Sequence, residues 1–134
     1  MASVHQEITV AARAADVWAS LRDVGNVHKR VVPGFLTDCR MEGEVRIVTF
    51  FNGMVAREPI VAVDDKAMRV AWAARSEGLE HYNASLQVFD DGPARCRVVW
   101  IADVLPHEAA KMVGAMMEQA MPIMKKTLEA SAAS

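Results

Sequence analysis

The last quarter of the chain carries one long apolar stripe, and this stripe constrains the fold more than any other feature. Apolar side chains recur between residues 108 and 130 at steps of three and four, which is the spacing of one helix face. They are Met112, Val113, Met116, Met117, Ala120, Met121, Met124 and Leu128. The pattern predicts a helix from Glu108 to Ala130 with a broad apolar face to bury. We expect a kink or break at Pro122, because proline removes one backbone hydrogen bond.

Strand-like segments fill most of the chain before this helix. Residues 3–10 alternate between apolar and polar side chains, which is typical of a half-buried strand. Two short helical pieces follow, over 14–22 and 26–32. Six further strands are then predicted, over residues 35–40, 44–51, 55–63, 68–75, 82–89 and 95–104. Tight turns such as Asn52-Gly53 join most of them, which favours antiparallel pairing of neighbours.

The order of these elements predicts how they pack. A large antiparallel sheet needs cover on its apolar face, and the C-terminal helix is the only predicted element long enough to supply it. We therefore predict an α+β fold: a curved antiparallel sheet of about seven strands around a long C-terminal helix. With 134 residues, the chain is expected to form one domain over residues 1–134.

Composition removes several classes of function. The 15 basic and 17 acidic residues nearly balance, so no charged footprint for nucleic acid is present. No run approaches the ~18 apolar residues that span a bilayer, and the N-terminus lacks the features of a secretory signal, so we expect a cytoplasmic protein. The four histidines and two cysteines show no metal-ligand spacing, so we expect neither a metal nor another cofactor. Oligomeric state stays open between monomer and homodimer.

The chain resembles the START-like superfamily, also called the Bet v 1-like or helix-grip fold, and within it the polyketide cyclase/dehydrase group. Four segments carry the resemblance: residues 15–18 (ADVW), 57–65 (REPIVAVDD), 81–88 (HYNASLQV) and 98–102 (VVWIA). Relatives often have a tryptophan soon after the first helix, whereas this chain has His28-Lys29-Arg30 there. The resemblance implies a cavity between sheet and helix that holds lipids, sterols, hormones or polyketides. A few relatives perform cyclisation, dehydration or proton transfer, and others bind chaperones.

Arg46, Glu58 and Tyr82 form the sharpest candidate for a catalytic site. They match, one position each, polar pocket residues of the plant lachrymatory-factor synthases, which resemble this branch. A buried glutamate with a raised pKa can move a proton, an arginine can hold an oxyanion, and a tyrosine hydroxyl can donate a hydrogen bond. The alternative is a structural ion pair between neighbouring strands beside a tyrosine packed in the core.

The loop at Asn52-Gly53 decides whether this set can act together. A two-residue turn would place Arg46 opposite Pro59, so that Glu58 would face away. A three-residue loop with a glycine bulge would place Arg46 and Glu58 on one face, diagonally related. The sequence permits both arrangements.

A ligand-binding wall is expected where the methionine stripe faces the strands. Methionine is flexible and polarisable, which suits a wall that adapts to apolar shapes, although it also fills ordinary cores. We expect the wall to include Phe50, Trp72, Tyr82, Leu86, Trp100, Met116, Met117 and Met121. Three functions remain in play: binding of an apolar small molecule, an enzyme of cyclase, dehydratase or isomerase type, and a protein-interaction module resembling co-chaperones.

Overall fold

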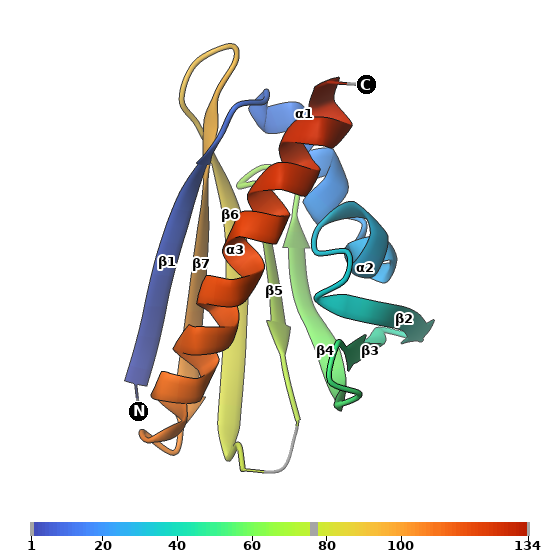
Figure 1. The fold of residues 1–134 in the computed structure, drawn as a ribbon, viewed down its shortest axis with the longest axis vertical. Helices are drawn as coiled ribbons and strands as arrows, with labels where there is room; N and C mark the ends of the chain where they lie inside the picture. Colours follow the sequence, from blue (N-terminus) through green and yellow to red (C-terminus); the bar gives the residue numbers. More distant parts are fainter. Residues whose placement is uncertain (1, 76–77, 134) are drawn as a thin grey trace.

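Seven strands and two main helical regions follow one another in the order that the periodicity predicts. The computed structural model describes residues 2–75 and 78–133. The elements are β1 (Ala2–Val10), α1 (Ala14–Leu21), the 3-10 turn η1 (Val24–Asn26), α2 (Val27–Arg30), β2 (Leu36–Glu42), β3 (Val45–Phe50), β4 (Val55–Asp64), β5 (Arg69–Ala73), β6 (His81–Asp90), β7 (Cys96–Leu105) and α3 (Ala109–Ala133). Figure 1 shows them in chain order from blue to red.

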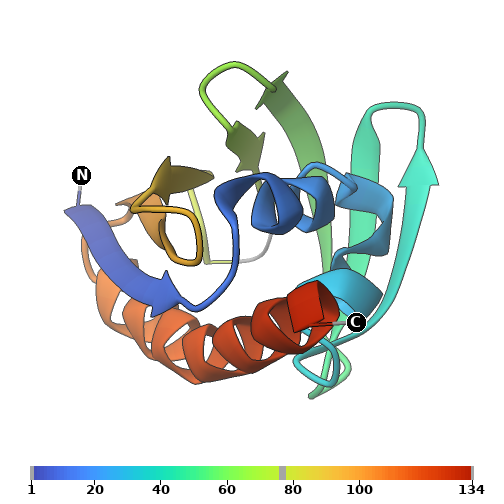
Figure 2. The same cartoon turned by 90° about the horizontal axis from the view of Figure 1, so that it is seen from above.

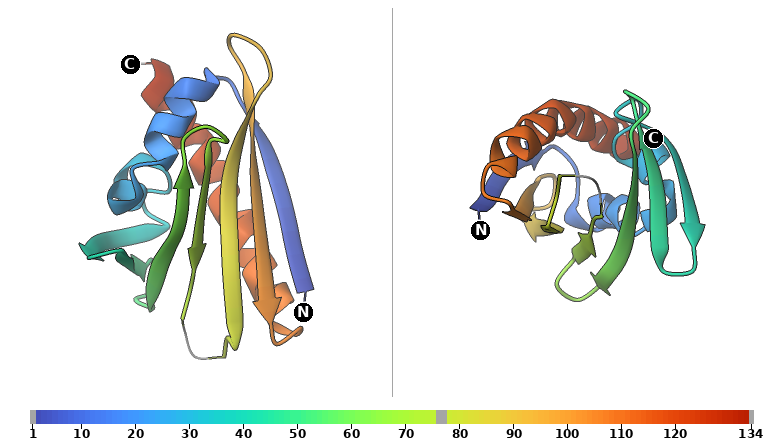
Figure 3. Two further views of the ribbon diagram at one scale, coloured as in Figure 1. Left: turned by 180° about the vertical axis from the view of Figure 1, so that it is seen from behind. Right: turned by 90° about the horizontal axis from the view of Figure 1, so that it is seen from below.

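All seven strands form one antiparallel sheet in the order β1-β7-β6-β5-β4-β3-β2. Only β1 pairs out of sequence: it lies beside the last strand, with Ala2 opposite Val104 and Val10 opposite Cys96. The sheet curves round α3, which closes its open side (Figure 2). Seen from behind, strands β4 to β7 present a convex face that none of the described helices covers (Figure 3). The predicted helix-grip architecture is confirmed.

The α3 helix is continuous through Pro122. The expected break is therefore absent, and the helix follows a gentle arc instead (Figure 2). Long helices that wrap a core commonly curve gently, and α3 curves in this way along its length (Figure 2). The inner face of α3 includes Met117, Met124 and Leu128, each 1 % exposed.

The α1 helix is attached to the sheet through the turn between β4 and β5. Asp65 in that turn accepts hydrogen bonds from Trp18 Nε1 at 2.9 Å and Arg22 Nε at 2.8 Å. The hydrogen bond and charge of Arg22 lower the pKa of Asp65, so the carboxylate is ionised at neutral pH. Asp65 thus fixes α1 against one end of the sheet, while α2 packs on β2 and α3.

Candidate functional site: a cavity between the sheet and the long helix

A cavity of about 190 Å³ lies between the concave face of the sheet and α3. An apolar cavity of about 150 Å³ is known to hold benzene, so this volume suits one or two small rings. Its lining comes from α1, α2, the segment that follows them, the six strands β2 to β7, and α3. The lining residues are Leu21, Val27, Val31, Val32, Phe35, Leu36, Arg46, Phe50, Met54, Ala56, Glu58, Val70, Trp72, Ala74, Leu79, Tyr82, Leu86, Trp100, Met112, Val113, Met116, Met117 and Met124.

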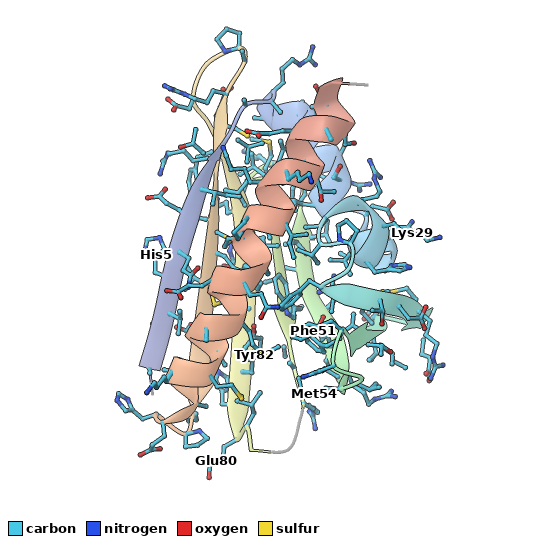
Figure 4. The ribbon with its side chains drawn as sticks, in the orientation of Figure 1. His5, Lys29, Phe51, Met54, Glu80 and Tyr82 are labelled. Carbon is cyan, nitrogen blue, oxygen red and sulfur yellow. The ribbon has the colours of Figure 1, made fainter. Side chains whose placement is uncertain are left out.

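The cavity opens towards the β3–β4 turn. Met54 beside that turn and Met112 near the start of α3 both line the cavity, yet they are 37 % and 52 % exposed. Because these two side chains both line the cavity and are exposed to solvent, they mark the mouth of the cavity. Figure 4 shows Met54 and Phe51 on the β3–β4 turn, with Tyr82 on β6, whereas His5 and Lys29 point outwards from other parts of the molecule.

Aromatic rings form much of the wall. The rings of Trp72 and Trp100 lie side by side on β5 and β7, with centroids 6.4 Å apart and planes tilted by 51°. Phe50 meets Phe35 edge to face at 5.8 Å. Such flat, rigid surfaces suit a planar apolar ligand, because aromatic pairs favour offset and edge-to-face contacts.

One end of the cavity is polar and is built on a buried ion pair. Arg46 on β3 and Glu58 on β4 are 5 % and 8 % exposed. Glu58 Oε1 accepts a hydrogen bond from Arg46 Nε at 2.9 Å and lies 2.8 Å from Nη2. Arg46 Nη1 donates to the backbone carbonyl of Val24 at 3.2 Å, and the guanidinium lies 5.2 Å from the centre of the Trp72 ring. Within the described part of the chain, Glu58 Oε2 accepts no hydrogen bond.

The loop between β3 and β4 explains why these two side chains share a face. Phe50 N–H donates to the Met54 carbonyl at 2.8 Å, so the loop has three residues, 51 to 53. Gly53 takes a φ of +87°, which favours glycine, as a glycine bulge requires. Arg46 and Glu58 are then directly opposite each other rather than diagonally related.

Burial dominates the electrostatics of this polar end. It raises the pKa of Glu58 above its usual value, while the charge and hydrogen bond of Arg46 act in the opposite direction. Burial also raises the pKa of Tyr82, and the nearby negative charge of Glu58 adds to the effect. The Tyr82 phenol therefore keeps its proton and can donate it in a hydrogen bond.

Trp100 contributes a polar group as well as a ring. Its indole N–H is buried and has no hydrogen-bond partner among the described residues. The Tyr82 hydroxyl lies beside this N–H, which acts to lower the pKa of the phenol. The two groups do not, however, form a hydrogen bond of good geometry. A buried donor without an acceptor is uncommon in folded proteins and calls for an explanation.

The structure brings most of the sequence-predicted site residues to this one place. Arg46, Glu58 and Tyr82 all line the cavity, as do Phe50, Trp72, Leu86, Trp100, Met116 and Met117. Met121 does not line it, although it is buried in the core at 4 % exposure. At 3.6 residues per turn, Met121 lies about 40° beyond Met117 on the side away from Met112 and Met116.

One part of the cavity wall is not among the residues expected from the sequence. The α1 and α2 region and the segment after it supply apolar side chains to the cavity, whereas we assigned the wall only to strands and the long helix. The missed residues from this region are Leu21, Val27, Val31, Val32 and Phe35, and Leu36 at the start of β2 was missed with them. Val27 and Val31 are four residues apart, a helical spacing that was available as a signal.

The described residues contain neither a cluster of metal ligands nor a helix that could span a membrane. Within residues 2–75 and 78–133, no cluster of three or more histidine, cysteine or acidic side chains is placed to hold a metal ion. No helix in the same ranges has the length and apolar character needed to cross a membrane. Cys39 and Cys96 are free thiols.

Solved structures of the same shape come from several organisms. The protein XoxI from Bacillus cereus aligns with a TM-score of 0.83 at 14 % identity, covering 100 % of this chain and 97 % of that one. A START superfamily protein from Mycobacterium smegmatis gives 0.74 at 14 % identity, covering 98 % and 97 %. Norcoclaurine synthase from Thalictrum flavum, in complex with dopamine and hydroxybenzaldehyde, gives 0.72 at 18 % identity, covering 96 % and 84 %. These likenesses show a shared fold.

Sequence comparison identifies the family more directly. No curated protein matches the chain. The family model described as polyketide cyclase / dehydrase and lipid transport matches residues 1–129, which is nearly the whole chain and agrees with the START-like fold. The chain therefore belongs to the polyketide cyclase / dehydrase and lipid transport family of the START-like superfamily.

Proposed function

We propose that this protein binds a compact hydrophobic or amphipathic molecule in the cavity between the sheet and α3. The observation that carries the proposal is the cavity itself: about 190 Å³, walled by apolar and aromatic side chains, with Arg46, Glu58 and Tyr82 at one end. Binding pockets are typically apolar with a few placed polar groups. A protein-interaction module would instead have a closed core.

The volume favours a ring compound over a long lipid. Drug-sized ligands occupy pockets of about 300–1,000 Å³, so this cavity would hold only a part of a full acyl chain or sterol. An aromatic or short polyketide-like molecule fits the paired rings of Trp72 and Trp100. The norcoclaurine synthase complex with dopamine and hydroxybenzaldehyde, two single-ring compounds, offers a parallel in a protein of the same fold.

Titration with a graded panel tests this proposal. In calorimetric titrations we expect acetophenone and 2-naphthol to bind saturably, and palmitate and progesterone to bind more weakly. Replacing Ala74, which lines the cavity, with tryptophan should weaken binding by at least about 10-fold by occupying the space. Ala73→Trp is the matched control, because its neighbour Ala73 does not line the cavity and is similarly half-buried. Absence of saturable binding across the panel would contradict the proposal.

A second candidate function is proton transfer on a bound carbonyl compound. Glu58 faces the cavity, and its Oε2 is free to accept a proton, which favours this candidate. Its raised pKa would bring the carboxyl nearer to the pH at which a general base works best. In such a step a C–H proton next to the carbonyl would pass to Glu58, and its electron pair would move into the enolate.

Deuterium exchange tests the enzyme candidate. In D₂O we expect the protein to accelerate exchange of the acetophenone methyl protons, which NMR follows as loss of their signal. The protein-catalysed exchange rate should be about 100-fold lower with Glu58→Gln than with the parent. Glutamine keeps a side-chain oxygen for Arg46 but cannot accept the proton. Exchange at an equal rate with Glu58→Gln, or at the buffer rate with the parent protein, would leave binding as the function.

A further inference from the structure

The polar end of the cavity carries two hydrogen-bond donors that have no described acceptor. The Trp100 N–H is buried and unpartnered, on a residue only 9 % exposed that lines the cavity. Tyr82 also lines the cavity; the Trp100 N–H beside its hydroxyl can only donate, so the hydroxyl proton has no acceptor there. Both belong to neighbouring strands, with Tyr82 opposite Val104 on β7 and Trp100 opposite Leu86 on β6.

An indole N–H can only donate, so chemistry restricts what can satisfy Trp100. Its partner must offer a lone pair, and the Tyr82 oxygen beside it is not placed to accept a hydrogen bond of good geometry. Glu58 lies on the same polar end, but neither of its carboxylate oxygens accepts a hydrogen bond from Trp100. A neutral acceptor oxygen on the ligand would complete the arrangement without adding charge to a buried site.

We propose that the cavity selects ligands that carry a carbonyl-type oxygen, and that the Trp100 N–H and the Tyr82 hydroxyl bind this oxygen together. A carbonyl oxygen has two lone pairs and can accept both bonds. The apolar remainder of the ligand lies between the rings and α3. This inference rests on the proposed binding function and specifies its ligand class: compact aromatic or cyclic ketones, aldehydes and esters.

The same geometry rejects the matched hydrocarbon. A ligand of equal shape without the oxygen leaves both donors unpaired in a closed space, and sites built to hydrogen-bond a ligand discriminate strongly against analogues that lack the group. Acetophenone and α-methylstyrene form such a pair, because the second replaces C=O with C=CH₂. The relative affinity for the two probes therefore measures the contribution of the donors.

Binding of the two probes by single variants tests the inference. Dissociation constants for both probes are measured with the parent, Tyr82→Phe and Trp100→Phe. We expect each substitution to weaken acetophenone binding by about 3- to 10-fold more than α-methylstyrene binding. Trp72→Phe is the matched control: it also removes a wall indole, and it should weaken both probes to a similar degree. Tyr82→Phe removes only the hydroxyl group and keeps the ring. If Trp100→Phe does not fold, Tyr82→Phe alone still tests the inference.

A spectroscopic readout separates hydrogen bonding from loss of shape. In a ¹H–¹⁵N spectrum, the Trp100 indole signal, identified by its loss in Trp100→Phe, should move downfield on addition of acetophenone and much less with α-methylstyrene. Equal binding of the two probes by all variants, with no indole shift, would overturn this inference and leave the binding proposal intact. Failure of the parent to bind these two probes or any compound of the panel above would overturn both.

Discussion

Replacing Arg46 with methionine is expected to lower the free energy of unfolding by about 3–5 kcal/mol at neutral pH. The substitution leaves the Glu58 carboxylate buried without its cation and frees the Val24 carbonyl from the bond with Nη1. Urea unfolding followed by circular dichroism measures the loss. The double variant Arg46→Met, Glu58→Leu should recover most of it, because an apolar pair of similar volume needs no partner.

The loss should also depend on pH. In the variant, burial without Arg46 raises the pKa of Glu58 still further above its ordinary value of 4.5. Between 4.5 and the raised value the folded protein binds more protons than the unfolded chain, so stability falls as pH rises through that window. The variant is therefore expected to lie closest to the parent in mild acid. A loss that is equal at both ends of the window would contradict this account of the pair.

The exposed pair between Arg97 and Glu7 is a matched control for these measurements. Its closest approach is also 2.8 Å, and its guanidinium lies 5.1 Å from the centre of the Phe89 ring, much as Arg46 lies over Trp72. The two side chains are 44 % and 46 % exposed. Arg97→Met should cost no more than about 1 kcal/mol, because exposed ion pairs contribute little. The comparison isolates burial as the cause of the larger loss.

Met117→Ala is expected to cost about 2–5 kcal/mol, since it removes a fully buried side chain from the inner face of α3. The new space joins the existing cavity, so the same variant should accept larger ring compounds than the parent. Met112→Ala on the same helix provides the comparison, because Met112 is 52 % exposed and its loss should cost less than about 1 kcal/mol. Equal losses at the two positions would mean that α3 is not packed as described.

Periodicity was sufficient to predict the fold of this chain. Each strand alternates or has apolar runs between turn residues, and the stripe of α3 has only one large apolar surface to pack against. Element bounds from the sequence agree with the structure within a few residues; α1, for example, ends at Leu21 rather than Arg22. Of the kink or break expected at Pro122, the break is wrong: the helix continues through the proline, which removes one backbone hydrogen bond without ending the helix.

The polar end of the cavity could not be predicted with the same certainty, because the sequence is compatible with two lengths of the β3–β4 loop. Asn52-Gly53 suits a two-residue turn as well as the last two positions of a three-residue loop, and only the second arrangement turns Glu58 inwards. The choice is made by tertiary packing: the backbone N–H of Phe51 bonds to the carbonyl of Phe35, which holds the turn against the segment before β2. No local pattern in residues 50–54 records that contact.

The pairing of β1 with β7 also determines the order in which the molecule can be completed. Val10 lies opposite Cys96, so the first strand made by the ribosome has no partner until more than eighty further residues have followed. Strands β2 to β6 can pair with neighbours as they emerge, whereas β1 must wait for the end of the sheet. Contacts of such long sequence separation slow folding. The cavity is thus closed last, by α3, when every residue of its polar end has already been synthesised.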